Sequence, residues 1–332
     1  MHCPPSASAA ARASPPSSNR WPEAASGSAR PASLVTHHRP TRRPARRPHA
    51  KELTMSATDT LQRPSTQAIV RAFGHPGPAK PFTEAETALL DTAQRRDISV
   101  RHTVRGHDEA HTLATWSWGR QGPRVLLVHG WESRASHWHA WVHPLLRAGF
   151  QVTAVDNLAH GQSTGDTANV RLWGQGLLAV AQAFGRIHAV IGHSAGSAAS
   201  LYAFAHGLQV DASVHIAGPA SLKRVATGFA LAHGLPREEI AAFRTALELQ
   251  LGFPMAEMDL PALQGGLRHP ALILHDPQDK EVPFTESLAL HEAWSLSQLL
   301  SVDGVGHRRI LRAPEVIALV IGSLSTPAAL AA

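Results

Sequence analysis

From residue 124 onward, short apolar runs recur along the chain, with polar or helix-like stretches between them. The runs lack the alternation of polar and apolar residues expected of a strand with one solvent-exposed face. They are typical of strands buried on both faces, as in a parallel sheet. The runs lie at residues 125–128, 152–155, 187–191, 213–217, 271–274 and 299–302.

Helical patterns occupy most of the intervals between these runs, at residues 138–148, 170–184, 195–205, 284–294 and 309–324. Upstream, a predicted helix at 84–92 precedes two alternating strands at 98–104 and 112–118, which indicate an antiparallel entrance to the sheet. We therefore expect an α/β fold with a doubly wound, mostly parallel sheet. In such sheets the ligand site lies at the carboxyl ends of the strands.

One interval is much longer than the others. Residues 219–268 are helical in pattern, at 222–231 and 237–251, with glycine and proline at the joints. We expect an inserted helical lid that sets substrate selectivity, while residues 81–218 and 269–326 form the core. Its apolar residues either line an acyl pocket or pack the lid onto the core: Phe229, Phe243, Leu247, Leu251, Phe253 and Met255.

The basic charge of the chain belongs to its N-terminal part. The formal net charge is +6, but outside residues 1–54 there remain 22 basic and 23 acidic residues, so no nucleic-acid partner is expected. Residues 1–54 are predicted to be a disordered extension rich in Pro, Ser, Ala and Arg. Residues 55–80 are predicted to be a linker in which prolines prevent any regular helix or strand. The extension is either translated leader upstream of a start at Met55 or a transit-like or regulatory tail.

Several other functions find no support in the sequence. Cys3 is the single cysteine, so no disulfide is expected within the fold, and a reducing, cytoplasmic location is predicted. No stretch is long and apolar enough to span a membrane, and none suggests attachment to one. His137, His139 and His143 lack a carboxylate or cysteine at ligand spacing, so no metal site is predicted.

The most informative motif is Gly192-His-Ser-Ala-Gly196, which follows a buried run and precedes a predicted helix. A strand, a sharp turn and a helix in this order hold Ser194 in a strained conformation, and small flanking residues avoid collisions with neighbouring backbone. A second match to the same pattern, around Ser163, is separated from its strand and is interpreted as a loop before a helix cap at Asp166-Thr167. Ser194 is therefore the candidate nucleophile.

Two later strand ends carry the other groups that a serine nucleophile needs. Asp279 follows the run at 271–274, and His307 follows the run at 299–302 behind two glycines. Ser194, Asp279 and His307 are thus predicted to act as nucleophile, orienting acid and base. Asp276, directly before Pro277, suits bonding to the backbone of its own turn instead.

The first two strand ends supply supporting groups. The N–H of Trp131, after the first buried run, and that of Ala195, at a helix start, are candidate donors to an oxyanion. For Trp131 taken alone, an ordinary strand-to-helix turn is the competing interpretation. Asp156 and His160, in the polar loop after the second run, are interpreted as structural.

Taken together, these motifs resemble those of the α/β-hydrolase family, its serine esterase and lipase branch in particular. The resemblance covers roughly residues 81–324 without the lid, and it departs at Leu158-Ala159, where many members carry Pro-Gly. The motifs that carry it are the turn at 129–131, the loop at 156–163, the elbow at 192–196, the turn at 276–283 and the loop at 304–307.

The resemblance implies a cofactor-free serine hydrolase that cleaves a carboxylic ester with a small or medium acyl group through an acyl-enzyme. An acyltransferase or perhydrolase would use the same three residues and differ only in the acceptor of the acyl group. A ligand-binding member of the fold is the alternative outside enzymes, although such a protein has no need for an intact Ser, Asp and His set. The expected partner is a small-molecule ester, and the sequence leaves the oligomeric state open.

Overall fold

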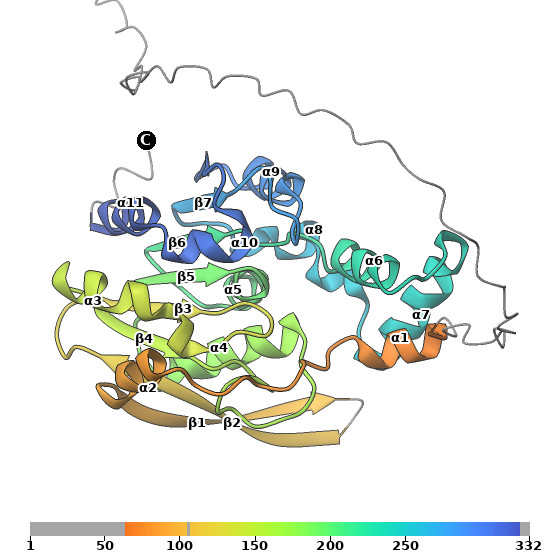
Figure 1. The fold of residues 1–332 in the computed structure, drawn as a ribbon, viewed down its shortest axis with the longest axis horizontal. Helices are drawn as coiled ribbons and strands as arrows, with labels where there is room; N and C mark the ends of the chain where they lie inside the picture. Colours follow the sequence, from red (N-terminus) through yellow and green to blue (C-terminus); the bar gives the residue numbers. More distant parts are fainter. Residues whose placement is uncertain (1–63, 105–106, 326–332) are drawn as a thin grey trace, which may run out of the picture. The chain divides into compact units, whose positions relative to one another are not determined.

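The strands form one sheet in the order β1-β2-β4-β3-β5-β6-β7-β8 in a computed structural model, which describes residues 64–104 and 107–325 (Figure 1). The described residues belong to one unit, Thr60–Ala332, and the predicted 1–54 extension lies outside them. The strands are β1 (Gln94–Val104), β2 (His107–Trp118), β3 (Arg124–Val128), β4 (Gln151–Val155), β5 (Ala189–His193), β6 (Ala212–Ile216), β7 (Ala271–His275) and β8 (Ser297–Ser301).

The pairing of the strands confirms the predicted doubly wound, mostly parallel α/β sheet. β1 pairs with β2, and β2 with β4, in antiparallel register. Every later pair, from β4 beside β3 across to β8, is parallel. The carboxyl ends of β3 and β5 to β8 therefore meet at one edge, where Ser194, Asp279 and His307 are expected.

The apolar runs of β3 to β7 are continuous because both faces of the sheet are covered there. The prediction of a strand buried on both faces was wrong for β8, which lies at the edge of the sheet and leaves Leu300 39% exposed. In β3, Leu126 and Val128 join one apolar cluster and Val125 and Leu127 join the other, and all four are completely buried. Two layers of helices cover the faces. One contains α4 (Val170–Phe184) and α5 (Ala195–Ala205), and the other contains α3 (His139–Arg147) and α11 (Pro314–Ser325).

Further helices flank these layers. They are α2 (Glu84–Asp91), α9 (Phe284–Ala293), α10 (Gly306–Arg309) and the 3₁₀ turns η1 (Ala135–Trp138) and η5 (Ile310–Arg312). Among the described residues, no helix is both long and apolar enough to cross a membrane. Asn169, not the predicted Asp166-Thr167, caps α4, because the side chain of Asn169 accepts a hydrogen bond from the N–H of Leu172.

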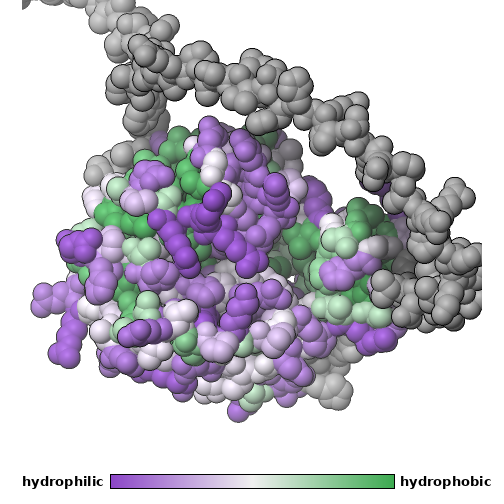
Figure 2. All heavy atoms as spheres, in the orientation of Figure 1, coloured by the Kyte–Doolittle hydropathy of each residue, from purple (hydrophilic) through white to green (hydrophobic). Residues whose placement is uncertain are grey.

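The long interval between β6 and β7 is helical. It contains α6 (Leu222–Ala232), η2 (Arg237–Glu239), α7 (Ile240–Leu251), η3 (Met255–Met258), α8 (Leu260–Leu263) and η4 (Gln264–Gly266). Phe243 and Leu247 are completely buried and join the same apolar cluster as α4 and α5. Hydrophobic residues also reach the surface over this part of the molecule (Figure 2).

One element was not expected from the sequence. Helix α1 (Thr66–Ala72) lies within the predicted linker, where Ser65 caps it, and Ile69 and Val70 are almost completely buried. The expectation that prolines exclude regular structure here was wrong, because Pro64 and Pro76 flank the helix rather than interrupt it. Figure 1 shows α1 beside α7, and the two helices are in contact.

Because β3 is buried, shortening one of its side chains should strongly reduce the stability of the fold. Leu127→Ala should lower the free energy of unfolding by about 2 to 5 kcal/mol, because it leaves a cavity between the sheet and its helices. Leu249→Ala, on α7, removes the same atoms from a side chain that is 75% exposed and should change it by less than about 0.5 kcal/mol. Urea unfolding of both variants tests this, and equal losses would contradict the assigned core.

Candidate active site

Ser194 occupies a strained turn between β5 and α5. Its backbone dihedrals are φ 52° and ψ −123°, a region that residues other than glycine rarely adopt. A Cβ at Gly192 would lie 2.8 Å from Cα of Ser197, and one at Gly196 would lie 2.4 Å from the carbonyl oxygens of Val128 and His129. The glycines therefore permit the close backbone approach that keeps Ser194 in this turn.

The loop after β3 passes directly beside this turn. A Cβ on Gly130 would lie 2.9 Å from Cβ of Ser194, so only glycine fits there. Among the hydrogen bonds of the described residues, none uses the backbone N–H of Trp131 or of Ala195. Both candidate oxyanion donors thus lie next to Ser194 with their N–H groups not engaged elsewhere.

His307 and Asp279 are brought together from two different strand ends. His307 Nδ1–H donates to Oδ2 of Asp279 at 2.7 Å, and the side chain of Asp279 is completely buried. Burial alone would raise the pKa of Asp279, but hydrogen bonds from His275, His307 and the Val282 N–H outweigh it and hold that pKa well below its usual range. Asp279 is therefore ionised, and His307 keeps its Nδ1 proton on the Asp279 side.

Two residues that the sequence did not single out as partners of His307 hold its loop. His193, next to Ser194, donates from Nε2 to the carbonyl oxygen of His307 at 2.8 Å. Asp276 accepts from the N–H of Gly306 as well as from Gln278 in its own turn. The prediction for Asp276 was thus confirmed for its turn, and its second bond ties that turn to the loop of His307.

Ser194 and His307 lie on neighbouring loops without a direct hydrogen bond. The ring centroids of His193 and His307 are 4.8 Å apart, so the residue preceding Ser194 contacts His307. Burial, and then the neighbouring His307, lower the pKa of His193 to about 3, so this contact involves a neutral His193. Within the described part of the chain, no hydrogen bond joins the hydroxyl of Ser194 to the His307 ring.

The loop after β4 makes hydrogen bonds that hold the backbone around the candidate site. Asp156 is buried, and it accepts hydrogen bonds from the N–H groups of Ala135 and Gln162. His160 accepts from the N–H of Glu132 at 3.0 Å and contacts the ring of Trp131. Both residues thus make the structural contacts expected of them. Ala159 adopts φ 62°, a conformation that favours glycine, which is the residue that many members of the resembled family carry at this position.

The second match to the serine motif has a structural role. The hydroxyl of Ser163 donates to the carbonyl oxygen of Asp156 and accepts from the N–H of Ala114. It lies in a turn that no strand directly precedes. The interpretation of this copy as a loop is confirmed.

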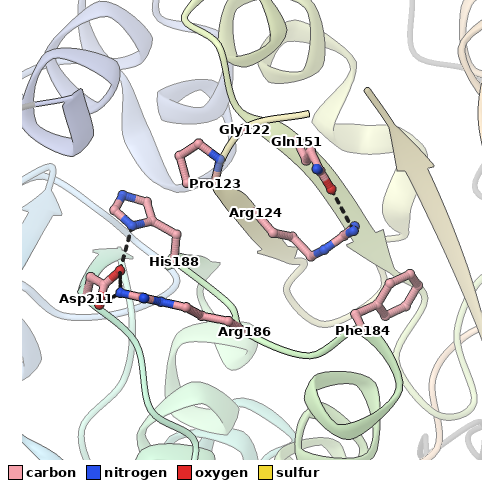
Figure 3. Close-up of a pocket in the computed structure, with 8 residues that line it drawn as sticks. All are labelled: Gly122, Pro123, Arg124, Gln151, Phe184, Arg186, His188 and Asp211. Carbon is pink, nitrogen blue, oxygen red and sulfur yellow. Dashed lines mark hydrogen bonds and ion pairs between the residues drawn. The ribbon is translucent and has the colours of Figure 1, made fainter. Parts of the chain in front are cut away.

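A groove of about 460 Å³ lies at the opposite end of the sheet (Figure 3). It is lined by residues at the amino ends of the strands, among them Arg124, Arg186, His188 and Asp211. Arg186 and His188 both bond to Asp211, and Arg124 bonds to Thr153 and Gln151. Because its charged groups already have partners and Ser194 follows the other end of β5, the groove is not the candidate active site.

A buried ion pair holds the loop that follows Trp131. Arg134 donates to both carboxylate oxygens of Glu86, at 2.8 and 3.0 Å, and Ser136 donates to the same carboxylate. Burial alone would raise the pKa of Glu86, but the bonds from Arg134, Thr83 and Ser136 hold it far below its ordinary value of 4.5. Helix α2 is thereby attached to the loop between β3 and α3.

Comparison with known proteins agrees with this arrangement. A family model described as the alpha/beta hydrolase fold matches residues 123–263. An esterase of Pyrococcus furiosus is similar in structure, with 21% identity and a TM-score of 0.54 over 76% of this chain and 97% of the esterase. A serine hydrolase of Cycloclasticus zankles has 15% identity and a TM-score of 0.52, over 70% of this chain and 99% of the hydrolase.

A thermophilic esterase of Thermogutta terrifontis is also similar, with 21% identity and a TM-score of 0.50, over 72% of this chain and 100% of the esterase. A search of curated proteins by sequence gave no match. At such low identities the solved structures are evidence for the fold alone.

The Glu86 pair predicts a dependence of stability on pH. Glu86→Gln should lower the free energy of unfolding by about 3 kcal/mol at pH 7, because it leaves the Arg134 charge buried without a counter-charge. The folded-state pKa of Glu86 lies below its unfolded value, so its contribution is complete above that value and is lost as the pH falls toward the folded pKa. The difference between parent and variant should therefore narrow below about pH 5.

Denaturant unfolding at pH 7, 5 and 3.5 measures this difference. Glu84→Gln, an exposed change on the same helix, serves as the control and should have little effect at any of these pH values. A Glu86→Gln loss that stays constant from pH 7 to 3.5 would contradict the ionised, hydrogen-bonded carboxylate.

Proposed function

We propose that this chain, which belongs to the α/β-hydrolase fold family, is a serine hydrolase that cleaves a carboxylic ester. The observation that carries the proposal is the hydrogen bond between His307 and the ionised Asp279, on loops beside the strained turn of Ser194. A serine, a histidine and a buried carboxylate arranged in this way are what nucleophilic catalysis by a hydroxyl requires.

In the first step, His307 acts as the general base. Because its Nδ1 proton is held by Asp279, the lone pair of the neutral ring is on Nε2. Nε2 takes the proton of Ser194 as its oxygen attacks the ester carbonyl, and the ionised Asp279 stabilises the imidazolium that forms. The hydrogen bond between Ser194 and His307 forms when substrate binds, since catalytic hydrogen bonds are often long in the free enzyme and shorten in the complex with substrate.

The developing oxyanion is assigned to the backbone N–H groups of Trp131 and Ala195. Both are free of other partners among the described residues, and Ala195 is the first residue of α5, where the helix dipole favours negative charge. Each well-placed donor contributes roughly 3 to 4 kcal/mol to transition-state stabilisation. His307 then protonates the leaving alcohol, and water activated by the same histidine releases the acyl group.

The substrate class follows from the chemistry and from the insertion. The acyl-enzyme step suits a carboxylic ester, and two similar solved structures are described as esterases. Helices α6 and α7 are proposed to form a lid, with residues 219–268 as the insertion and 81–218 and 269–326 as the core. The substrate is proposed to carry a small or medium acyl group. Phe243, Leu247 and Met255 of the insertion pack against the body of the protein, as in the alternative interpretation of these residues.

Labelling with a fluorophosphonate probe and turnover of p-nitrophenyl acyl esters test this function. Ser194→Ala should abolish labelling and lower kcat by on the order of 10⁵ to 10⁶. Asp279→Asn should lower kcat by about 10⁴, because the neutral amide no longer holds the required tautomer of His307.

Ser163→Ala is the matched control, because Ser163 stands in the second copy of the motif. This variant should label and turn over within a few-fold of the parent. Labelling that disappears in Ser163→Ala but persists in Ser194→Ala would overturn the assignment of the nucleophile. A folded parent protein that neither labels nor cleaves any ester of the series would overturn the proposed hydrolase function.

A further inference from the structure

The segment from α1 to α2 contacts three separate parts of the protein. We call residues 66–86 the strap. It begins with α1 beside the inserted helices, continues past the loop after β4, and ends in the first turn of α2 (Figure 1). None of the chemistry proposed above uses it, yet its hydrogen bonds lead directly to the loop that carries Trp131.

At its start, the strap is attached to the insertion. Gln250 of α7 donates from its side chain to the carbonyl oxygens of Val70 and Phe73, at 2.8 and 3.3 Å. The ring of Phe73 packs edge-on against Phe229 of α6, with centroids 5.2 Å apart. Helix α1 therefore packs as a third helix alongside α6 and α7.

In its middle, the strap touches the residue that follows Trp131. The N–H of Gly77 donates to Oε1 of Glu132 at 3.1 Å. A Cβ on Gly77 would lie 3.0 Å from the same oxygen, so another residue there would displace the end of the exposed Glu132 side chain. A little earlier in the chain, the carbonyl oxygen of Gly74 accepts from the N–H of Ala168.

At its end, the strap is clamped by Arg134. The guanidinium donates to the carbonyl oxygens of Lys80 and Pro81, at 2.6 and 3.0 Å, and it lies 3.9 Å from the ring centroid of Phe82. The same guanidinium forms the buried pair with Glu86. Glu132 and Arg134, two residues apart, thus bind the middle and the end of the strap.

The peptide group that contains the Trp131 N–H is held on both sides, and Glu132, which the strap contacts, is the residue after it. The carbonyl of Gly130 belongs to the same peptide group as that N–H, and it accepts from Nδ1–H of His129 at 2.7 Å. On the other side, Glu132 adopts φ 52°, and its own N–H donates to His160. A residue in this strained conformation keeps it only while its surroundings hold it, and the bond from Gly77 is one of its holds.

We propose that the strap is part of the catalytic apparatus and that Glu132 is a positioning residue, held by Gly77, that aims the Trp131 N–H at the oxyanion. This inference rests on the proposed hydrolase function. The hold acts on a donor that binds charge present only in the transition state, so its loss lowers kcat and leaves substrate binding almost unchanged. It also makes the strap a connection between the inserted helices and the oxyanion donor.

The test compares Glu132→Ala, Glu132→Gln and the parent chain in ester turnover. Removing one oxyanion donor costs about 10²- to 10³-fold in kcat, so a donor that is misaligned but present should cost about tenfold. We expect that loss in Glu132→Ala, with KM changed less than about twofold. Glu132→Gln keeps an oxygen that can accept from Gly77 and should retain at least about half of the parent kcat.

An alkyl boronic acid gives a second readout, because its adduct with a serine is a tetrahedral anion. Its affinity should fall in Glu132→Ala by the same factor as kcat. Gly77→Ala disturbs the same contact from the strap side and should show a smaller loss of kcat with the same unchanged KM. Glu292→Ala, an exposed change on α9 outside the strap, is the control and should match the parent.

The results separate this inference from the proposed function. A parent that labels with fluorophosphonate, together with a Glu132→Ala variant of parental kcat, would overturn the strap proposal alone. Equal impairment of Glu132→Ala and Glu132→Gln would also overturn it, because the charge and not the hydrogen bond would then matter. Should Glu132→Ala fail to fold, as judged by circular dichroism, Gly77→Ala decides, and a parental kcat there overturns the proposal. A parent that never labels would overturn the function on which both rest.

Discussion

The close packing of backbone around Ser194 is the constraint on which the rest of the structure depends. Gly192, Gly196 and Gly130 each face an atom that would clash with any side chain, and Ser194 itself is held at φ 52°. Such strain persists only when the surroundings over-determine the conformation. Here the parallel strands β3 and β5, buried on both faces, supply that rigidity.

From this centre, buried polar contacts extend outward along the strand ends. His193 holds the loop of His307, Asp276 joins that loop to the turn of Asp279, and Asp279 is kept ionised by the hydrogen bonds it accepts. On the other side, His129 and His160 bind the backbone around Trp131. Each of these buried side chains makes at least one hydrogen bond to backbone, which favours a single arrangement of the loops.

Much of the fold and of the candidate site could be predicted from the sequence, because the relevant patterns are local. Apolar runs of four or five residues identify strands buried on both faces, and the flanking glycines identify the turn at Ser194. Asp279 and His307 could be chosen because each follows a predicted strand, although β8, before His307, lies at the edge of the sheet and is only partly buried. Helix α1 was missed because prolines on both sides of a short segment resemble a linker, and its stability comes from burial against α7, which sequence periodicity does not reveal.

By itself, then, the sequence determined which candidate catalytic residues follow the carboxyl ends of the strands, and in which order they occur along the chain. Only the tertiary structure decided which of these residues touch. The contacts of Gly77 with Glu132 and of His193 with His307 join residues 55 and 114 positions apart. Such pairings depend on the packing of whole elements, so no local pattern of side chains could encode them in a form readable from one sequence.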